Sequence, residues 1–322
     1  MTPLCPRSLA AVGAAMLALS LFAVPADAMR LDEPAPGGSA PQRCIDAQAQ
    51  DSGARAATNG RQPDHRDLTV EEKQAIEQRA DRILREKRFS SYDAGTLSVD
   101  VPVYVHVMLS ESGEGNVSRE QILDQFAALN AHFGGQASPE AAVTGFTFTL
   151  KGVKRYYNDT WHTGGESVRY RSLTRVGGAG TLNMWLVDMG GLGIATFPSD
   201  YDAAPKKDGI RVHYASLPGG SIENYNLGGT ATHEAGHWLG LYHTFDGGCS
   251  RPNDQVGDTP AQRFPTDGCP EGQDTCPGRR GLDPIHNYMD YSYDRCYNQF
   301  TGGQSARMAN MWTAFRADDG RF

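Results

Sequence analysis

The strongest constraint on this chain of 322 residues is the segment HEAGHWLGLYH, which runs from His233 to His243. Residues four positions apart on a helix share a face, so His233 and His237 can present two imidazole nitrogens to one centre. Gly240 lacks a Cβ and can adopt the left-handed conformation that ends a helix, which lets His243 return as a third ligand. Three protein ligands leave one position open to water, as in a catalytic zinc site.

Glu234 follows His233 directly. A carboxylate at this position can take a proton from a metal-bound water without itself being a ligand. A short His-Glu-x-x-His pattern also arises by chance on a polar helix face. Here, however, three of the nine histidines fall within a single short segment, with a glycine where the turn needs one. The sequence therefore predicts a zinc site with Glu234 as general base and acid.

The first 28 residues have the pattern of an export signal. Arg7 supplies a basic start, the run from Leu9 to Val24 is apolar, and residues 26–28 form a small-x-small cleavage site. A membrane anchor is the alternative, but the apolar run is short for a span and ends at a cleavable site. We predict that residues 1–28 are removed and that the mature protein is secreted without a membrane segment.

The net charge of −8 argues against nucleic acid or an anionic membrane as a partner. Five cysteines remain after the signal, and disulfides are the default in an exported protein. No Cys-x-x-Cys pair is present, which disfavours a cysteine zinc site. Four cysteines cluster toward the C-terminus and allow three pairings. They are Cys249, Cys269, Cys276 and Cys296, whereas Cys44 lies apart.

Residues 29–67 are rich in Pro, Gly and polar residues and cannot build a core alone. Thr69 and Glu72 form a capping box that opens a charged helix, expected to reach about Phe89 and to lie over another domain. Residues 90–95 are typical of a linker. We predict a propeptide over residues 29–95, with Lys87-Arg88 as one candidate processing site, and one catalytic domain over residues 96–322.

Valines that alternate from Val99 to Val107 predict a half-buried strand, in which Pro102 indicates a partly unpaired edge. Helices are expected from Ser118 to about Phe133, around the zinc motif, and after Thr301. The order of elements predicts an α+β fold with a cleft below the sheet. Further strands are expected over residues 146–157, 181–188, 193–197 and 209–214, with a loop over 158–180.

These motifs resemble those of the pappalysin family of metzincin metallopeptidases, especially its small secreted microbial members. The resemblance extends from about Leu97 to Phe315 and depends on the zinc motif, DQVGDTP from Asp254, and LDPIHNYMDY from Leu282. It implies a metzincin-like catalytic domain, with a twisted, mostly parallel sheet and with backing and active-site helices above the cleft. It also implies an irregular, disulfide-braced lower subdomain with a C-terminal helix.

The resemblance further implies a secreted endopeptidase with one catalytic zinc, made as a latent precursor. Met289 would form a hydrophobic floor beneath the three histidines. Tyr291 would stabilise the tetrahedral intermediate, and a neutral phenol can donate a hydrogen bond to an oxyanion. The family's disulfides correspond to Cys249 with Cys276 and to Cys269 with Cys296.

The segment that begins at Asp254 resembles the family's calcium loop. Carboxylate, hydroxyl and backbone oxygens are the ligands that calcium prefers, although Asp, Gly and Pro are also typical of ordinary turns. Gln262 stands where relatives often carry Glu, which would weaken the site. The candidate ligands are Asp254, Val256, Asp258 and Thr259.

Three further expectations concern latency and substrate. The Cys44 thiolate could occupy the open zinc position, although family zymogens carry Cys-Gly here, and an idle thiol is the alternative. Extended peptides are expected to bind by β-augmentation along an edge strand from Gly193 to Phe197. The Asp294 carboxylate could select basic substrate residues, whereas Arg295 could neutralise its charge.

Two alternative functions remain. One is a zinc hydrolase of non-protein amides, and the other is a non-catalytic binding module, which the intact Glu234 disfavours.

Overall fold

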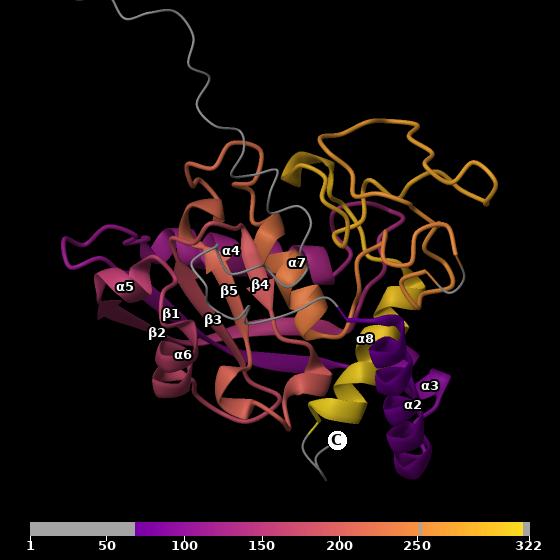
Figure 1. Ribbon diagram of the computed structural model, residues 1–322, viewed down its shortest axis with the longest axis horizontal. Helices are drawn as coiled ribbons and strands as arrows, with labels where there is room; N and C mark the ends of the chain where they lie inside the picture. The colour runs from indigo at the N-terminus through magenta and orange to yellow at the C-terminus, as the bar shows by residue number, and fades with distance from the viewer. Residues whose placement is uncertain (1–67, 251–252, 318–322) are drawn as a thin grey trace, which may run out of the picture. The chain divides into compact units, whose positions relative to one another are not determined.

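The structure is a computed structural model that describes residues 68–250 and 253–317. The predicted export signal and Cys44 lie outside these residues. No helix in the described ranges combines the length and apolar character that a membrane span needs. The strands (Figure 1) are β1 (Val99–Leu109), β2 (Phe146–Tyr157), β3 (Leu182–Val187), β4 (Gly193–Ala195) and β5 (Ile210–His213). The helices are α2 (Val70–Lys87), α3 (Ser91–Thr96), α4 (Arg119–Phe133), α5 (Asp159–His162), α6 (Ser167–Thr174), α7 (Gly229–Trp238) and α8 (Gly302–Phe315).

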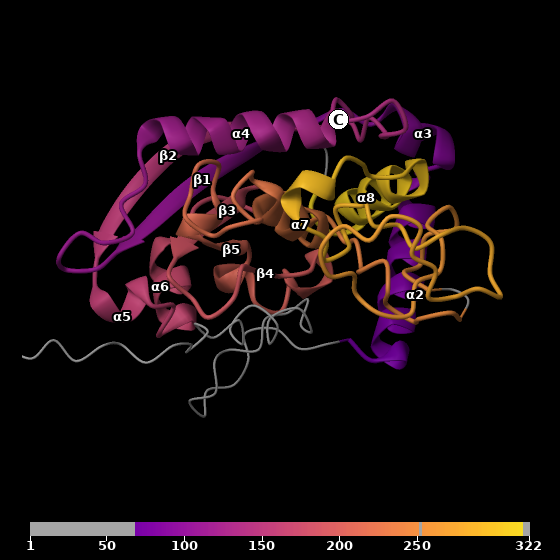
Figure 2. The same ribbon diagram turned by 90° about the horizontal axis from the view of Figure 1, so that it is seen from above.

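The five strands form one sheet in the order β2-β1-β3-β5-β4. All neighbouring pairs are parallel except β4 with β5, so the predicted mostly parallel sheet is confirmed. Helices α4 and α7 pack on one face, where their apolar residues join those of β1, β3 and β5 in one core. Helices α5 and α6 lie on the opposite face (Figure 2).

The prediction of a half-buried β1 is wrong for its second half, where both alternating sets of side chains are buried. The reason is that residues 158–180, expected as a loop, contain α5 and α6, which cover the second face. Asn158 caps α5 by accepting a hydrogen bond from the Trp161 amide at 2.8 Å. In α6, Tyr170 and Thr174 are buried one turn apart, and the Thr174 hydroxyl accepts from the Trp185 indole of β3.

Pro102 lies where the sequence analysis expected a free edge. β1 pairs with β2 along its whole length, but its pairing with β3 begins only at Val103. Pro102 has no amide hydrogen to donate, so this position before the second ladder begins is compatible with proline.

Helix α2 begins with the predicted capping box, in which Thr69 and Glu72 exchange hydrogen bonds. It packs on the C-terminal helix α8, where Ala80 contacts Met311 and Ala314. Helix α2 thus packs on a helix of the segment predicted as the catalytic domain, while the division into two domains stays a prediction. The predicted linker after it is wrong, because α3 forms there and lies against α8, with Ala94 buried.

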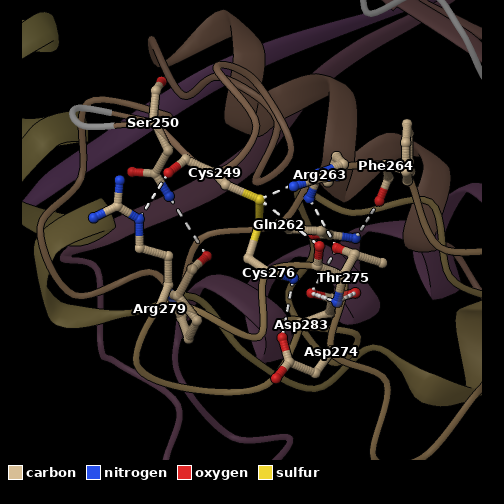
Figure 3. Close-up of a disulfide and its surroundings, with 12 residues drawn as sticks. Cys249, Ser250, Gln262, Arg263, Phe264, Asp274, Thr275, Cys276, Arg279 and Asp283 are labelled. Carbon is tan, nitrogen blue, oxygen red and sulfur yellow. Dashed lines mark hydrogen bonds between the residues drawn. A yellow bond between two sulfur atoms is a disulfide. The ribbon is translucent and has the colours of Figure 1, made fainter.

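Residues 241–300 are here called the loop region; in its described parts, 241–250 and 253–300, the one helix or strand is a short 3-10 turn, Asp294–Cys296. Two disulfides cross-link this region, and they join the cysteines as the family resemblance implies: Cys249–Cys276 and Cys269–Cys296. Around the first (Figure 3), the Asp283 carboxylate accepts hydrogen bonds from the Thr275 amide and hydroxyl. The loop region is thus held by covalent and polar links.

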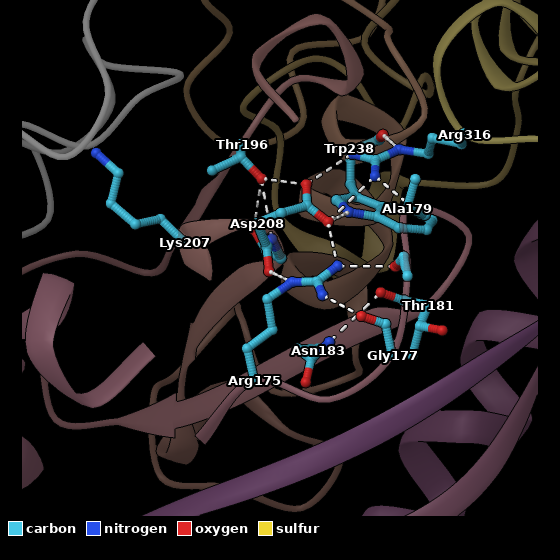
Figure 4. A network of polar contacts seen from close by, with 12 residues as sticks. Arg175, Gly177, Ala179, Thr181, Asn183, Thr196, Lys207, Asp208, Trp238 and Arg316 are labelled. Carbon is cyan, nitrogen blue, oxygen red and sulfur yellow. Dashed lines mark hydrogen bonds and ion pairs between the residues drawn. The ribbon is translucent and has the colours of Figure 1, made fainter. Parts of the chain in front are cut away.

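A buried ion-pair network joins the sheet to the end of α8 (Figure 4). Arg316 donates to both carboxylate oxygens of Asp208, at 3.0 and 3.2 Å, and Arg175 donates at 3.2 Å. The same carboxylate accepts from the Trp238 indole and from the Thr196 hydroxyl. Asp208 therefore connects the last residue of α7, the segment after β4 and the end of α8.

Candidate metal centre and active site

The three predicted histidine ligands converge in the structure. His233 and His237 project from α7, and His243 returns after the turn that ends this helix. Their Nε2 atoms lie 3.0, 3.1 and 3.2 Å from one another. All three side chains are buried, and their nitrogens are grouped closely enough to hold one metal ion.

The protonation of two rings follows from their other nitrogens. His233 Nδ1 lies 2.7 Å from the Tyr288 carbonyl oxygen, and His237 Nδ1 lies 2.8 Å from that of Leu241. A carbonyl only accepts, so each Nδ1 carries the proton and each Nε2 presents a lone pair. Burial lowers the pKa of His233 to about 4, against the opposing hydrogen bond to Tyr288, so this ring is neutral at pH 7.

This donor set fits zinc. Lone pairs of neutral imidazoles repel one another at these separations unless a cation lies between them. Zinc binds imidazole nitrogen at about 2.0–2.1 Å, so tetrahedral ligands lie roughly 3.3 Å apart. The observed nitrogen separations are within a few tenths of an ångström of that value.

Gly240 makes the turn for two separate reasons. Its φ of +98° is in the left-handed region, which residues with a Cβ rarely adopt. A Cβ at this position would also lie 2.6 Å from Cγ of Met311 in α8. The helix ends at Trp238, and the Leu241 amide donates back to the Gly236 carbonyl at 2.9 Å. The structure therefore has the predicted helix stop before His243.

Met289 lies against the metal-binding helix. It is fully buried, and a Cβ added to Gly236 would come within 2.5 Å of its sulfur. Gly236 is between His233 and His237 in sequence, so its missing side chain lets Met289 pack closely against this part of α7. The Tyr291 ring lies 4.7 Å from the ring of His243 and 5.6 Å from that of His233.

Glu234 lies at the join between α7 and the sheet edge. Its side chain is 5% exposed, and Oε2 has no hydrogen-bond partner among the described residues. A Cβ on Gly193 would collide with this carboxyl group, so the first residue of β4 must be glycine for the two to pack. Burial raises the pKa of Glu234 well above its ordinary value, and the charge of Arg211 opposes the shift.

Three of the four candidate calcium ligands come together. The Thr259 hydroxyl lies 2.8 Å from both carboxylate oxygens of Asp254 and 3.0 Å from the Val256 carbonyl oxygen. Asp258 points elsewhere: its carboxylate accepts from the Thr301 hydroxyl and the Gly303 amide at the start of α8, both at 2.7 Å. Burial raises the pKa of Asp254 to about 7, with the Thr259 hydrogen bond opposing.

Asp294 has a role that the sequence analysis missed. Its carboxylate accepts hydrogen bonds from the Leu227 amide at 2.8 Å and the Gly229 amide at 3.2 Å. The N-cap residue of α7 is Gly228, which has no side chain to cap the helix. Asp294 thus satisfies amides at the start of the metal-binding helix from more than 60 residues away. The Arg295 guanidinium donates a hydrogen bond to the side-chain oxygen of Asn224 at 2.8 Å.

Gln262 also has an unpredicted role. Its side-chain amide donates to the Asp290 carboxylate at 3.0 Å and to the Phe264 carbonyl at 2.9 Å, and its oxygen accepts from the Thr244 hydroxyl. Asp290 directly follows Met289. Gln262 therefore ties the segment after the third histidine to the segment that carries the methionine.

Comparison with known proteins identifies the family. The family model described as pregnancy-associated plasma protein-A, of the M43 peptidases, matches residues 187–313. An extracellular metalloprotease of Neurospora crassa is 44% identical over 228 residues, which cover 69% of this chain and 77% of that protein. Extracellular metalloprotease 1 of Coccidioides posadasii is 46% identical, over 68% of this chain and 79% of that protein.

The chain belongs to the pappalysin family of metallopeptidases. Solved structures agree: a promirolysin mutant of Tannerella forsythia superimposes with a TM-score of 0.64 at 29% identity, over 76% of this chain and 88% of that one. Mature mirolysin in complex with a cleaved peptide gives 0.60 at 30% identity, over 68% and 96%. This pappalysin is an extracellular zinc metalloendopeptidase, so the predictions of family, enzyme class and secretion are confirmed.

Proposed function

We propose that this pappalysin hydrolyses peptide bonds at the centre formed by His233, His237 and His243, with Glu234 as general base and acid. The observation that carries the proposal is the convergence of three buried Nε2 atoms beside a buried carboxyl group. Three protein ligands leave the fourth position of a tetrahedral ion open for water or substrate.

His233, His237 and His243 would hold the zinc ion, which would lower the pKa of a water molecule and polarise the scissile carbonyl. Glu234 takes the proton of the attacking water and transfers it to the leaving amine nitrogen. Tyr291 donates its hydroxyl hydrogen bond to the developing oxyanion. Met289 packs under the ligand rings and fixes their positions. No covalent intermediate with the protein is needed.

The substrate is a protein or peptide that binds in an extended form along residues Gly193 to Phe197, of which Gly193–Ala195 form the edge strand β4, shorter than the strand expected from the sequence. β4 is at the end of the sheet, and β5 pairs with only one of its two sides. Gly193 touches Glu234, so a strand added to β4 would bring its backbone to the general base. The structure of mirolysin has been solved with a cleaved peptide, which supports the proposal of a peptide substrate for the present chain.

We also propose that residues 1–28 are an export signal and that residues 29–95 form a propeptide that keeps the domain over residues 96–322 latent. Helix α2 of this segment reaches the zinc motif through a charged pair: Glu77 accepts from Arg307 at 2.7 and 3.0 Å, and Arg307 donates to the Gly240 carbonyl at 2.8 Å. Cys44 would supply a thiolate to the open zinc position. Replacing Cys44 with Ala should then raise the activity of the unprocessed precursor.

A structural calcium ion is proposed at Asp254, Val256 and Thr259, where the Thr259 hydroxyl lies within 3.0 Å of the Asp254 carboxylate and of the Val256 carbonyl oxygen. Asp258 could join these ligands only if its carboxylate gave up the hydrogen bond that it accepts from the Gly303 amide of α8. Asp294 remains the candidate for selecting basic substrate residues.

The test compares the processed wild-type protein with Glu234→Gln on casein, a peptide library and small non-protein amides. Glu223→Gln, an exposed substitution, is the matched control. We expect peptide cleavage that a zinc chelator abolishes and that falls by about 10²–10⁴-fold in Glu234→Gln at unchanged zinc content. Equal activity in both proteins contradicts the assigned base. Cleavage of non-protein amides alone, or peptide binding without cleavage, supports the corresponding alternative function.

A further inference from the structure

A second group of metal-ligand side chains is present among the described residues, apart from the three histidines. Glu114, His162 and Asp188 each offer one ligand atom, and these atoms lie within 4.8 Å of one another. Each residue follows the carboxyl end of a parallel strand: β1 ends at Leu109, β2 at Tyr157 and β3 at Val187. Carboxyl ends of parallel strands meet along one sheet edge, where α/β proteins commonly bind ligands.

One ring nitrogen of His162 has no hydrogen-bond partner among the described residues. Its side chain is 3% exposed, and Nδ1 lies 2.9 Å from the Met108 carbonyl oxygen, so Nδ1 carries the proton. Nε2 then presents a lone pair, and no group in residues 68–250 or 253–317 makes a hydrogen bond with this buried atom. The nearest Asp188 oxygen is 3.8 Å away, too far for a hydrogen bond. Buried polar atoms are normally satisfied, so a buried imidazole nitrogen without such a partner, close to two carboxylates, is a candidate metal ligand.

The Asp188 carboxylate is oriented toward this nitrogen by a second histidine. His213 Nδ1 accepts from the Ala215 amide at 3.1 Å, so its proton is on Nε2, which lies 3.0 Å from Asp188 Oδ1. Oδ2 therefore remains available on the side of His162. The Asp188 amide also donates to the His162 carbonyl at 2.7 Å, which fixes the two backbones together. Metal-binding carboxylates are commonly held by hydrogen bonds of this kind.

Glu114 is brought to the site by a tight loop. Its amide donates to the Ser110 hydroxyl at 2.8 Å, and its carbonyl accepts from the Ser110 amide at 3.1 Å. The next residue, Gly115, has a φ of +82°, and a Cβ there would lie 2.7 Å from Cε1 of His162. The glycine thus allows the loop to close directly over the imidazole.

We propose that Glu114, His162 and Asp188 form a second metal site, which binds a divalent transition ion of the Zn²⁺ type through His162 Nε2 and one oxygen of each carboxylate. An imidazole ligand disfavours Ca²⁺ and Mg²⁺, which prefer oxygen, whereas zinc accepts mixed nitrogen and oxygen ligands. Glu114 is exposed, so water can complete the coordination.

The ion would act on the sheet edge used by substrate. Asp188 begins the segment that leads to β4, and the Leu192 carbonyl in this segment accepts from the His213 amide at 2.8 Å. Gly193 follows and contacts Glu234. A bound ion would join this segment to the ends of β1 and β2 and would stabilise the position of β4 relative to the general base.

The test measures zinc bound per chain in the full protein as secreted, dialysed against a buffer that holds free zinc constant. We expect two zinc ions in wild type and one in His162→Gln. Because Glu114 is exposed, Glu114→Gln leaves folding intact, and we expect it to weaken the second site at least about tenfold. Glu111→Gln, an exposed glutamate in the same loop, and His286→Gln should keep two ions with unchanged affinity.

His237→Gln separates this inference from the proposed active site, because it should retain one ion, and adding Glu114→Gln should weaken the binding of that ion. The inference is overturned if saturated wild type holds one ion and His237→Gln holds none. It is also overturned if Glu114→Gln and Asp188→Asn both bind two ions with wild-type affinity.

Discussion

The two regions that meet at the metal centre are stabilised in different ways. The sheet region, residues 99–238, buries a continuous set of valine, leucine, isoleucine and phenylalanine side chains between the sheet and helices α4 and α7. The loop region has little regular structure and is held by two disulfides and by buried side chains such as Gln262 and Asp283. The first region supplies His233, His237 and Glu234, and the second supplies the third histidine and the methionine.

The two regions therefore position their site residues in different ways. A helix packed on an apolar core fixes His233, His237 and Glu234, the proposed ligands and base, with little freedom. The third ligand lies on a segment whose position depends on a glycine turn and on polar links, as between Gln262 and Asp290. Changes in the sheet region should therefore alter global stability most, whereas changes in the loop region should alter the metal site selectively.

The largest effect is expected from Asp208→Asn, which breaks the buried ion pairs with Arg316 and Arg175. Removing one partner of a buried pair leaves an uncompensated charge and typically costs about 3–5 kcal/mol. Urea unfolding measures this loss. The loop-region control is Asp283→Asn, which removes only hydrogen bonds to neutral groups and should cost about 1–3 kcal/mol. A larger loss for Asp283→Asn would reverse the comparison.

The two disulfides give a matched pair, because each spans a sequence separation of 27. Removing either pair by double Cys→Ala substitution should cost about 3–4 kcal/mol, from the loop-closure entropy regained by the unfolded chain. Only the pair Cys269–Cys296 is next to Asp294 and the methionine segment. We therefore expect weaker zinc binding after its removal, and little change after removal of the other pair. Hydrogen exchange should show the sheet amides still protected in both variants.

The regions should also differ in the sign of their pH dependence. Burial lowers the pKa of His106 in the sheet region from 6.5 to about 4, with the Asn183 hydrogen bond opposing. Because the unfolded chain binds this proton more tightly, stability is lost as pH falls from about 6.5 to about 4. Burial raises the pKa of Asp294 from 3.8 to about 6, with backbone hydrogen bonds opposing. The folded chain then binds the proton more tightly, so stability is lost as pH rises from about 4 to about 6.

Each of these contributions is on the order of 3 kcal/mol when fully developed. Urea unfolding between pH 4 and pH 8 tests them with His106→Gln and Asp294→Asn. As pH rises, the stability of wild type relative to His106→Gln should increase, whereas its stability relative to Asp294→Asn should decrease. Parallel curves for wild type and variant would show that the group does not titrate between the two states in this range.

The smallest effect is expected at the surface. Arg79 of α2 and Asp202 form an ion pair at 2.6 Å, but their side chains are 37% and 70% exposed. Such pairs contribute about 0–1 kcal/mol and are screened by salt. Asp202→Asn should therefore leave the unfolding free energy within about 1 kcal/mol of wild type. A loss as large as that of Asp208→Asn would mean that burial does not decide the effect.

Local patterns predicted most of the fold. The capping boxes at Thr69, Ser118 and Thr301, the valine alternation of β1 and the glycine at position 240 each determine structure within a few residues. Helices α3, α5 and α6 were missed because they are short, and their stability depends on packing against distant elements rather than on their own periodicity.

The site shows the same limit. Three histidines and a glycine at fixed spacing predicted the convergence of the ligands, because one helix and one turn position them. The Asp294 cap, the Gln262 bonds to Thr244 and Asp290, and the displaced Asp258 involve partners 18 to 67 positions away in sequence. Only the tertiary fold brings such groups together. The one local signal was Gly228, which is the N-cap residue of α7 and has no side chain, so that a group from elsewhere was needed to cap the helix.

The most direct test of the account is anomalous X-ray scattering at the zinc absorption edge from crystals of Glu234→Gln. We predict a zinc peak about 2.0–2.1 Å from Nε2 of His233, His237 and His243. The same preparation should hydrolyse peptides far more slowly than wild type. A crystal without a zinc peak among these three nitrogens, or a variant that cleaves peptides at the wild-type rate, would contradict the account.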